Sequence, residues 1–434
     1  MGPKRTARMP RLHMRTLGVL AAGAMAAVLW SAIAGADEPH PDATVLREGE
    51  VLAHWLKSSP ENAFWRAQIG SARFDVIAAK VWPNPELTLG FQRAVAGEPI
   101  NGLTGYSAQV SAPLPVFGQI GARRDAAEAL VNVAETTVLN SLWLRAADIQ
   151  AAMVARAFSD GRLVMLRRNL QELDRIERIV ALRRSAGASG EYDMLRVTTS
   201  TATLRAAVNT AMIERDRAES NIVALVADPT FTSAPITRDG LISFTGPESE
   251  AGLIAVALKR RPDLELARRG VIANERAATR FRRDAIPTPS IFVGGARSFG
   301  PESVYVTGGV SFPLSLFDRN QGQIGRALSD AQGQQFLVAA LEARARAEVS
   351  GSWRARENAR AGLAQFRDKS LIAATELLKR AEITYQAGKF SITELFDAYQ
   401  TMWDARSQEL DLERQMADAE ADLERAAVLG SLPP

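Results

Sequence analysis

The stretch that decides the fold is Val310-Ser311-Phe312-Pro313-Leu314, because nearly the same residues occur earlier as Val110-Ser111-Ala112-Pro113-Leu114. A second pair of matching segments lies upstream of these, at residues 83–90 and 287–294, and each begins with two prolines separated by one residue. Matching segments in the same order are typical of an internal repeat. The sequence therefore predicts a tandem duplication.

The matching segments have the alternation of β-strands. Leu87, Leu89 and Phe91 alternate with polar or small residues, and Tyr106 and Val110 belong to a second alternating run. Side chains two residues apart lie on the same face of a strand. Each run is about 8 to 10 residues long, which is enough for a tilted strand to cross a membrane.

Two such strands in each repeat make four strands in the chain. A sheet in lipid cannot leave its edges unpaired, so it must close on itself. The small outer-membrane barrels have about eight strands, so four are too few. If these strands cross a membrane, several chains must therefore share one barrel.

Helices are predicted after each strand pair. Proline is absent from residues 116–228 and again from 314–432, and proline inside a helix costs about 3 kcal/mol. Glycines, which often end helices, interrupt the first stretch at residues 186–190 and the second at 387–389. We therefore expect two long helical hairpins. The arm over residues 118–185 would be about 100 Å long at ~1.5 Å per residue.

The last arm carries the heptad pattern of a coiled coil. Leucine, methionine and alanine recur in two neighbouring seven-residue columns, and the many alanines permit close helix packing. The two columns comprise Leu395, Met402, Met416 and Leu423, and Ala398, Ala405, Leu412, Ala419 and Ala426.

The predicted fold is mainly α with a small membrane β portion. It combines a long coiled-coil α-helical barrel with a shared transmembrane β-barrel, built by tandem duplication. The predicted boundaries are a signal peptide at residues 1–36, a first repeat at 37–230, a connector at 231–250 and a second repeat at 251–434. Each repeat consists of a helix, two strands and a long helical hairpin.

The N-terminus has the pattern of a secretory signal peptide. Five basic residues precede an apolar run at residues 17–33, and Ala34 and Ala36 provide a small-residue cleavage site. Removal of this segment would turn the formal net charge of +3 slightly negative. A nucleic-acid-binding protein would be expected to keep a basic patch, so we expect no nucleic-acid partner.

The chemistry-bearing residues are few. The chain has no cysteine and three histidines, and only His40 and His54 lie beyond the signal. No metalloprotease, nucleophile-elbow or phosphate-loop motif occurs. We therefore expect no enzyme, no cofactor and no bound metal centre.

From about residue 45 to 430, the chain resembles the TolC-like outer-membrane efflux family. The resemblance is carried by Arg261-Pro262-Asp263-Leu264, by residues 312–322, and by Tyr385-Gln386-Ala387-Gly388 with the segment 392–398. It implies an outer-membrane homotrimer with a shared barrel in lipid and a helical tube in the periplasm. It also implies a periplasmic adaptor (membrane fusion) protein and an inner-membrane pump, of the RND type, as partners.

The resemblance also implies a tunnel entrance at the second hairpin tip. Glu394 and Asp397 match acidic positions that form rings there, and Tyr385 matches a position that closes the entrance. The tip residues that would dock the adaptor are Gly187, Gly190, Gly388 and Lys389.

Residues 317–322 resemble most the branch that exports heavy-metal cations, which favours metal efflux. A multidrug or small-molecule duct of the same family is the alternative. A periplasmic coiled-coil adaptor or scaffold is an alternative from another class, which would share the hairpins and lack four matched strands.

Overall fold

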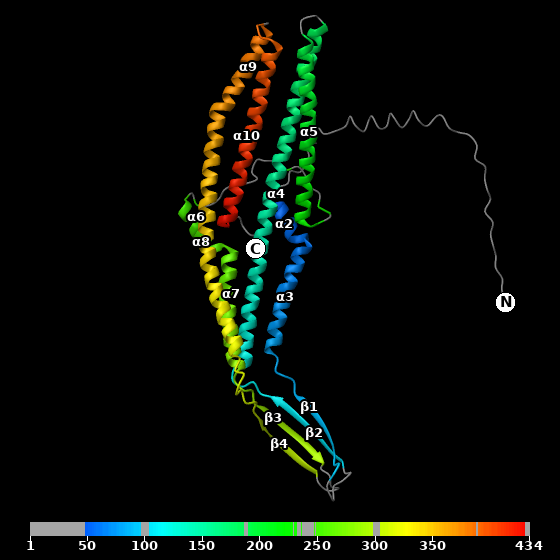
Figure 1. Cartoon of the computed structure of the whole chain (residues 1–434), viewed down its shortest axis with the longest axis vertical. Helices are drawn as coiled ribbons and strands as arrows, with labels where there is room; N and C mark the ends of the chain where they lie inside the picture. Colours follow the sequence, from blue (N-terminus) through cyan, green and yellow to red (C-terminus); the bar gives the residue numbers. More distant parts are fainter. Residues whose placement is uncertain are drawn as a thin grey trace, which may run out of the picture. The chain divides into compact units, whose positions relative to one another are not determined.

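The computed structural model describes residues 48–96, 104–185, 190–228, 230–231, 236, 247, 249–297, 304–387 and 389–429 (Figure 1). These residues lie in one compact unit, Val45–Pro434. The predicted signal peptide with Ala34 and Ala36 lies outside them. So do Gly187, Gly388 and most of the expected connector.

The described residues of the first half of the chain contain four helices. They are α2 (Glu48–Ser58), α3 (Pro60–Lys80), α4 (Gln119–Ser185) and α5 (Glu191–Val226). Helix α3 begins after Ser59, whose hydroxyl accepts a hydrogen bond from the Glu61 amide, and Pro60 occupies its first turn. Helix α5 ends at Ala227 in the left-handed conformation.

The second half repeats this order. It contains α6 (Glu250–Arg260), α7 (Pro262–Asp284), α8 (Gln321–Phe366), α9 (Ile372–Gln386) and α10 (Ile392–Ala427). Arg261 is the N-cap residue of α7, and Pro262 is its first residue. The predicted first arm of this hairpin is interrupted by a π-helical turn, η1 (Arg367–Leu371), between α8 and α9. No glycine or proline marks this turn, so proline and glycine positions could not reveal it.

The strands form one antiparallel sheet in the order β1-β2-β3-β4. They are β1 (Glu86–Arg93), β2 (Thr104–Pro113), β3 (Ser290–Arg297) and β4 (Val304–Ser311). Strands β2 and β3 join the two repeats, and β1 and β4 are the edges. In the register, Val110 pairs with Leu87 on β1 and with Val293 on β3, so one face of the sheet collects the apolar side chains predicted by the alternation.

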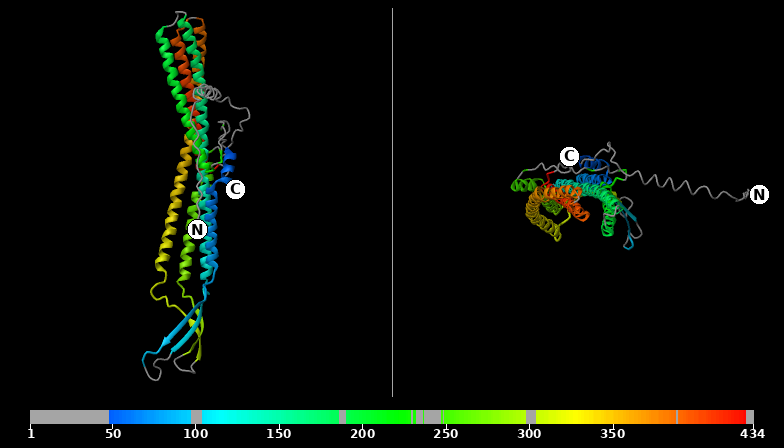
Figure 2. Two further views of the ribbon diagram at one scale, coloured as in Figure 1. Left: turned by 90° about the vertical axis from the view of Figure 1, so that its right-hand side faces the viewer. Right: turned by 90° about the horizontal axis from the view of Figure 1, so that it is seen from above.

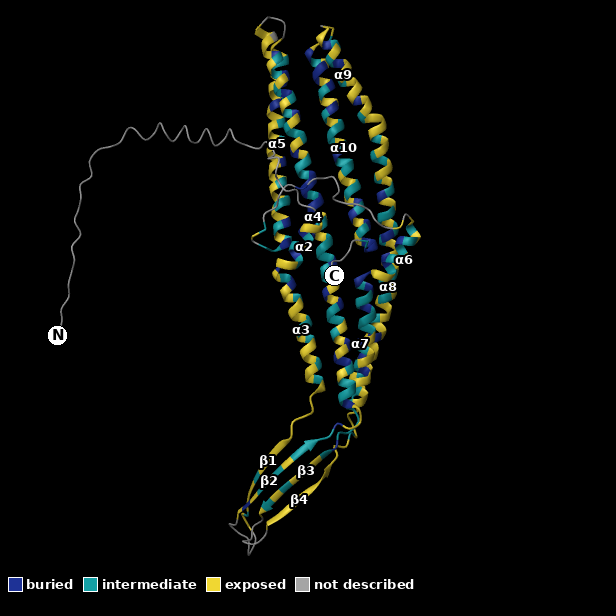
Figure 3. Cartoon of the chain, turned by 180° about the vertical axis from the view of Figure 1, so that it is seen from behind, coloured by how far each residue is buried: buried dark blue, intermediate teal, exposed yellow. Residues whose placement is uncertain are grey.

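The core lies between the helices. One cluster around Trp55 and Met153 packs α2 against α4 and α5, and another around Leu173 and Phe396 joins the two hairpins. In α10 (Figure 3), no member of the two heptad columns is exposed. The buried members are Leu395, Met402, Leu423, Ala398, Ala419 and Ala426. The predicted helix-packing seam is thus confirmed.

The structure agrees with the predicted mainly α fold with a small sheet and an internal repeat. Among the described residues, no helix is both long and apolar enough to cross a membrane.

Candidate functional site at the hairpin tips

The tips of both hairpins lie at the end of the helices farthest from the sheet (Figure 1). Figure 2 shows the teal α4 and red α10 side by side in this region, and these two helices are in contact. The predicted entrance residues therefore lie where one hairpin faces the other.

Helix α10 begins at this end with a capping box. The Ser391 hydroxyl accepts a hydrogen bond from the Glu394 amide at 3.3 Å, and the Glu394 carboxylate accepts one from the Ser391 amide at 2.7 Å. The hydrogen bond from the Ser391 backbone and then that from its hydroxyl lower the pKa of Glu394. Glu394 is therefore an exposed, charged carboxylate that also fixes the start of α10.

The preceding helix ends with backbone hydrogen bonds. The Ala387 amide donates to the Ile383 carbonyl and the Lys389 amide donates to the Thr384 carbonyl, both at 3.0 Å. This arrangement closes the last turn of α9. Lys389 is exposed at this tip, and Gly190 is exposed at the start of α5 on the other tip.

Asp397 forms an ion pair across the two hairpins. Its carboxylate accepts a hydrogen bond from the Arg196 guanidinium on α5 at 2.5 Å. The same guanidinium lies 5.2 Å from the centre of the Phe396 ring, which is a cation–π distance. Asp397 thus connects the second hairpin to the first while remaining exposed.

A second polar contact between hairpins lies further along the same helices. Glu172 on α4 accepts hydrogen bonds from the Trp403 indole at 2.7 Å and from Arg406 at 3.1 Å. Both donors belong to α10. Two acidic residues, one from each hairpin, therefore make polar contacts between the hairpins near this end.

Tyr385 lies in the core. It is 7% exposed and packs in the cluster with Leu173, Val197 and Leu395. Nearby, the Tyr399 hydroxyl donates to Glu382 at 2.6 Å. Burial first, and then this hydrogen bond to a carboxylate, raises the pKa of Tyr399.

The structure brings Tyr385, Glu394 and Asp397 to one tip region, together with Lys389. Sequence reasoning missed Arg196 and Glu172. Both stand on helices of the first hairpin, and no motif connects them with α10. Their roles depend on which faces of the hairpins meet, and a single-helix pattern does not contain that information.

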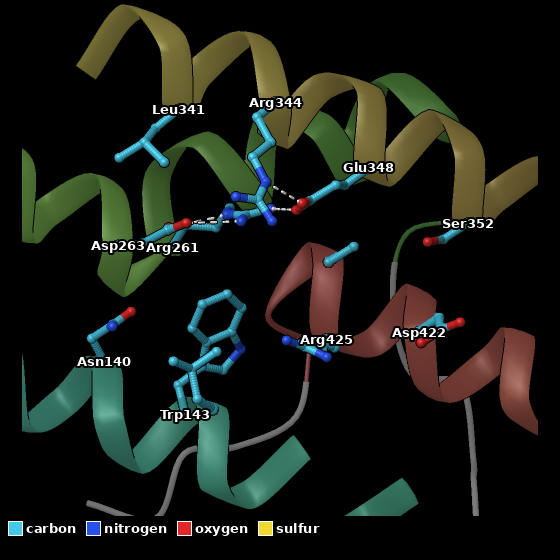
Figure 4. Close-up of a pocket in the computed structure, with 12 residues that line it drawn as sticks. Asn140, Trp143, Arg261, Asp263, Leu341, Arg344, Glu348, Ser352, Asp422 and Arg425 are labelled. Atoms are coloured by element: carbon cyan, nitrogen blue, oxygen red, sulfur yellow. Dashed lines mark hydrogen bonds and ion pairs between the residues drawn. The ribbon is translucent and has the colours of Figure 1, made fainter. Parts of the chain in front are cut away.

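A separate cavity of about 520 Å³ lies between α4, α8 and α10 (Figure 4). Buried Arg261 contacts Asp263 at 2.8 Å and Glu348 at 2.6 Å, and lies 5.4 Å from the Trp143 ring. Partial burial opposes ionisation of Glu348, but hydrogen bonds from Arg261 and Arg344 hold its pKa below the ordinary value. The Arg261-Pro262-Asp263-Leu264 motif is thus part of the helix packing.

The described part of the chain contains no group of three or more histidine and carboxylate side chains placed to hold a metal ion.

Comparison with known proteins agrees with this architecture. Residues 253–428 match the family model described as "Outer membrane efflux protein". The "Cobalt-zinc-cadmium resistance protein CzcC" of Cupriavidus metallidurans is 25% identical over 365 residues, which cover 82% of this chain and 84% of that protein.

Two solved structures show the same fold. A membrane protein from Pseudomonas aeruginosa superposes with a TM-score of 0.74 at 20% identity, over 91% of this chain and 99% of that one. The channel protein CusC superposes with a TM-score of 0.73 at 17% identity, over 91% of this chain and 95% of that one.

A small sheet at one end of two long helical hairpins, whose tips meet at the other end, defines a class of outer-membrane channel subunits. The chain matches the outer membrane efflux protein family over residues 253–428. It is an outer-membrane efflux channel subunit with its helical part in the periplasm.

Proposed function

We propose that this subunit forms the passive exit duct of a tripartite system that exports heavy-metal cations. The observation that carries the proposal is the sequence relationship with a cobalt-zinc-cadmium resistance protein over most of both chains. The likeness of residues 317–322 to the heavy-metal branch supports the same substrate class.

In this proposal the working form is a homotrimer. The two strand edges, β1 and β4, are free in the single chain, and an open sheet in lipid must find partners. Each chain contributes two repeats, residues 37–230 and 251–434, joined by a connector at 231–250. A periplasmic adaptor and an RND-type inner-membrane pump deliver the cations, so substrate choice lies with the pump.

The entrance is proposed at the hairpin tips. Glu394 and Asp397 are exposed acids on the first two turns of α10, and threefold symmetry would repeat them around the axis. A ring of carboxylates concentrates cations and repels anions. Tyr385 supports this end from the core, and the adaptor would dock on Gly187, Gly190, Gly388 and Lys389.

Growth of a deletion strain on matched panels of metal salts and antimicrobial compounds tests the substrate class. We expect sensitivity to cobalt, zinc, cadmium or copper that the gene restores. Sensitivity confined to organic compounds would contradict the metal assignment and favour a multidrug duct. Full growth on both panels would contradict an efflux role under these conditions.

Membrane fractionation addresses the scaffold alternative. The sheet, with one predominantly apolar face, is not needed by a periplasmic adaptor or scaffold, and this favours the channel. Recovery of the chain as a soluble periplasmic protein would reverse that preference.

A further inference from the structure

The segments that join the sheet to the helices expose an unusual number of large apolar side chains. Phe317 is 90% exposed and Leu314 is 76% exposed, on the loop between β4 and α8. Other exposed members of this set are Val81, Trp82, Val116, Phe117, Phe312 and Leu316. We call these eight residues the junction belt. Exposed apolar side chains gathered in connecting segments of this kind are typical of an interaction site.

Backbone hydrogen bonds hold the junction belt in this exposed arrangement. The Leu316 amide donates to the Leu314 carbonyl at 2.9 Å, and in the other repeat the Val116 amide donates to the Leu114 carbonyl at 2.8 Å. The Leu114 amide also donates to the Pro289 carbonyl at 2.7 Å. The first loop is therefore tied to the segment that leads into β3, and each loop has a local turn that leaves its apolar side chains exposed.

An apolar groove opens beside the belt. It has a volume of about 360 Å³ and is lined by Ala285, Ile286 and Pro287 at the end of α7 and by Leu314, Leu316 and Arg319 at the start of the second hairpin. The Asn320 amide group donates to the Phe281 carbonyl at 3.1 Å, which fixes the two sides of the groove to each other. Such a groove suits an acyl chain.

Arg319 lines this groove, and two more arginines precede its lining segment in the sequence. Arg282 and Arg283 occupy the last turn of α7, just before the groove-lining segment, and both are exposed, as is Arg319. Within the described residues, no acidic side chain forms an ion pair with these three. Asp284 forms ion pairs with Arg123 at 2.9 Å and with Arg280 at 3.4 Å. The Asp318 carboxylate accepts a hydrogen bond from the Asn320 backbone amide at 2.9 Å.

We infer that the junction belt, the groove and the Arg282, Arg283 and Arg319 guanidiniums bind anionic phospholipid of the periplasmic leaflet of the outer membrane. The apolar face of the sheet continues into the junction belt, so lipid that contacts the sheet meets the belt where the membrane ends. Aromatic residues are enriched at this level of membrane proteins, and guanidiniums recognise phosphate oxygens in a planar, bidentate way. This inference rests on the outer-membrane location of the sheet.

The lipid class is tested with the full-length protein purified in its oligomeric form and placed in nanodiscs of phosphatidylethanolamine and phosphatidylglycerol. Native mass spectrometry then counts the lipids that each sample retains. We expect phosphatidylglycerol to be retained preferentially, and the preference to fall several-fold in an Arg282→Gln, Arg283→Gln, Arg319→Gln variant. Arg346→Gln with Arg354→Gln, which removes two exposed charges from the middle of α8, should keep it.

The apolar part has its own readout. Brominated phosphatidylglycerol in the nanodisc should quench fluorescence more strongly in a Phe317→Trp variant than in the native protein, whose own tryptophans give the background. Equal quenching of the two proteins would contradict lipid contact at Phe317, and equal retention of both lipids by the native protein would also overturn the inference. Failure here is distinguishable from failure of the efflux proposal, because metal resistance of cells carrying the triple-arginine variant is scored separately.

Discussion

At the scale of single residues, the contact between Arg196 and Asp397 matters most for the entrance. It joins α5 to α10 at 2.5 Å with both side chains partly in solvent. Such exposed pairs contribute about 1 kcal/mol or less. A contact of this strength can bias a tip between two arrangements without locking either one.

We therefore predict that Asp397→Asn increases the open fraction of single channels by up to about fivefold, which corresponds to ~1 kcal/mol. Planar-bilayer recording of the purified protein measures this. Arg162→Gln is a matched control, because its pairing with Asp411 lies away from the tip. A reciprocal exchange, Arg196→Asp with Asp397→Arg, should restore the native open fraction. Native gating in the single variant would exclude the contact as a restraint on the tip.

Glu48, the first residue of α2, has a carboxyl group whose pKa is strongly raised. Burial first, and then the negative charge of Glu424 on α10, raises the pKa of Glu48 to about 7. The folded state therefore binds this proton more tightly than the unfolded state does. Its contribution to stability is favourable at acidic pH and is lost as the pH rises through about 7.

We predict that Glu48→Gln stabilises the docking of α2 at pH 8 by about 1 kcal/mol, since solvent screens a side chain that stays partly exposed. Thermal unfolding as a function of pH measures the effect. Between about pH 5 and about pH 8, the stability of the Glu48→Gln variant should fall less than that of the native protein. Glu50→Gln on the same helix should show the native decline. A Glu48→Gln profile parallel to that of the native protein would contradict the assignment.

At the scale of elements, the start of α10 depends on its capping box. Ser391→Ala removes the hydroxyl that accepts a hydrogen bond from the Glu394 amide. Loss of such a cap costs about 1 kcal/mol of helix stability. Hydrogen exchange of the amides in the first turn of α10 should accelerate about fivefold. Ser249→Ala, at the start of α6, should accelerate exchange there and leave α10 unchanged. Unaltered exchange in α10 after Ser391→Ala would show that packing alone holds the tip.

Within the sheet, Gly294 allows β2 and β3 to lie together. A Cβ atom at this position would stand 2.7 Å from the Ala108 carbonyl oxygen, whereas one at Gly295 would have 3.9 Å to its nearest neighbour, the Tyr305 carbonyl oxygen. We predict that Gly294→Ala lowers the yield of assembled, heat-resistant oligomer in outer membranes, and that Gly295→Ala does not. Equal yields, measured on unheated gels, would refute the steric argument.

The elements differ in how far the sequence could predict them. The strand pairs and the α10 seam follow from period-two and heptad patterns, because each pattern records which side of one element is buried. The π-helical turn at Arg367–Leu371 left no such pattern. Arg196 opposite Asp397 depends on how two hairpins far apart in sequence pack, so motif matching found Asp397 without its partner.

At the scale of the whole molecule, the open sheet determines what can assemble. Strands β1 and β4 are separated by two intervening strands, which places them about 14 Å apart at ~4.8 Å per strand. A disulfide needs Cα atoms within about 7 Å, so cysteines on β1 and β4 of one chain cannot pair. The native chain has no cysteine that would interfere.

We predict that single cysteines at Leu89 on β1 and Val306 on β4, combined in one chain, give covalent oligomers on non-reducing gels. Neighbouring β4 positions from Val304 to Val310 are scanned against Leu89 so that successive registers between chains are covered. Leu89→Cys alone serves as the control and should remain monomeric on the gel. Monomeric bands at every tested register would argue against direct β1-to-β4 pairing of neighbouring chains.

Assembly is also where prediction from the sequence reached its limit. The four strands imply an incomplete barrel on physical grounds, since lipid tolerates no free edge. The number of chains that complete it came from the family resemblance. The number of chains in a closed barrel depends on the angle between neighbouring subunits. The sequence of one chain predicts the two edge strands but not this angle, so the trimer is a proposal.

The π-helical turn also sets a rule for building chimaeras from related channels. A π-turn holds one residue more than an α-turn, so every side chain beyond it is rotated by about 100° relative to an unbroken helix. Helix α9 therefore presents to α10 a face that is out of phase with α8. If the cuts lie on the tip side of Arg367–Leu371, the transplanted tip takes the helical phase that the host's own turn sets. If they lie on the sheet side, the donor's turn and its helical phase are transferred together. Only a donor with a π-helical turn at the same position can be joined at either cut while α9 still packs against the heptad columns of α10.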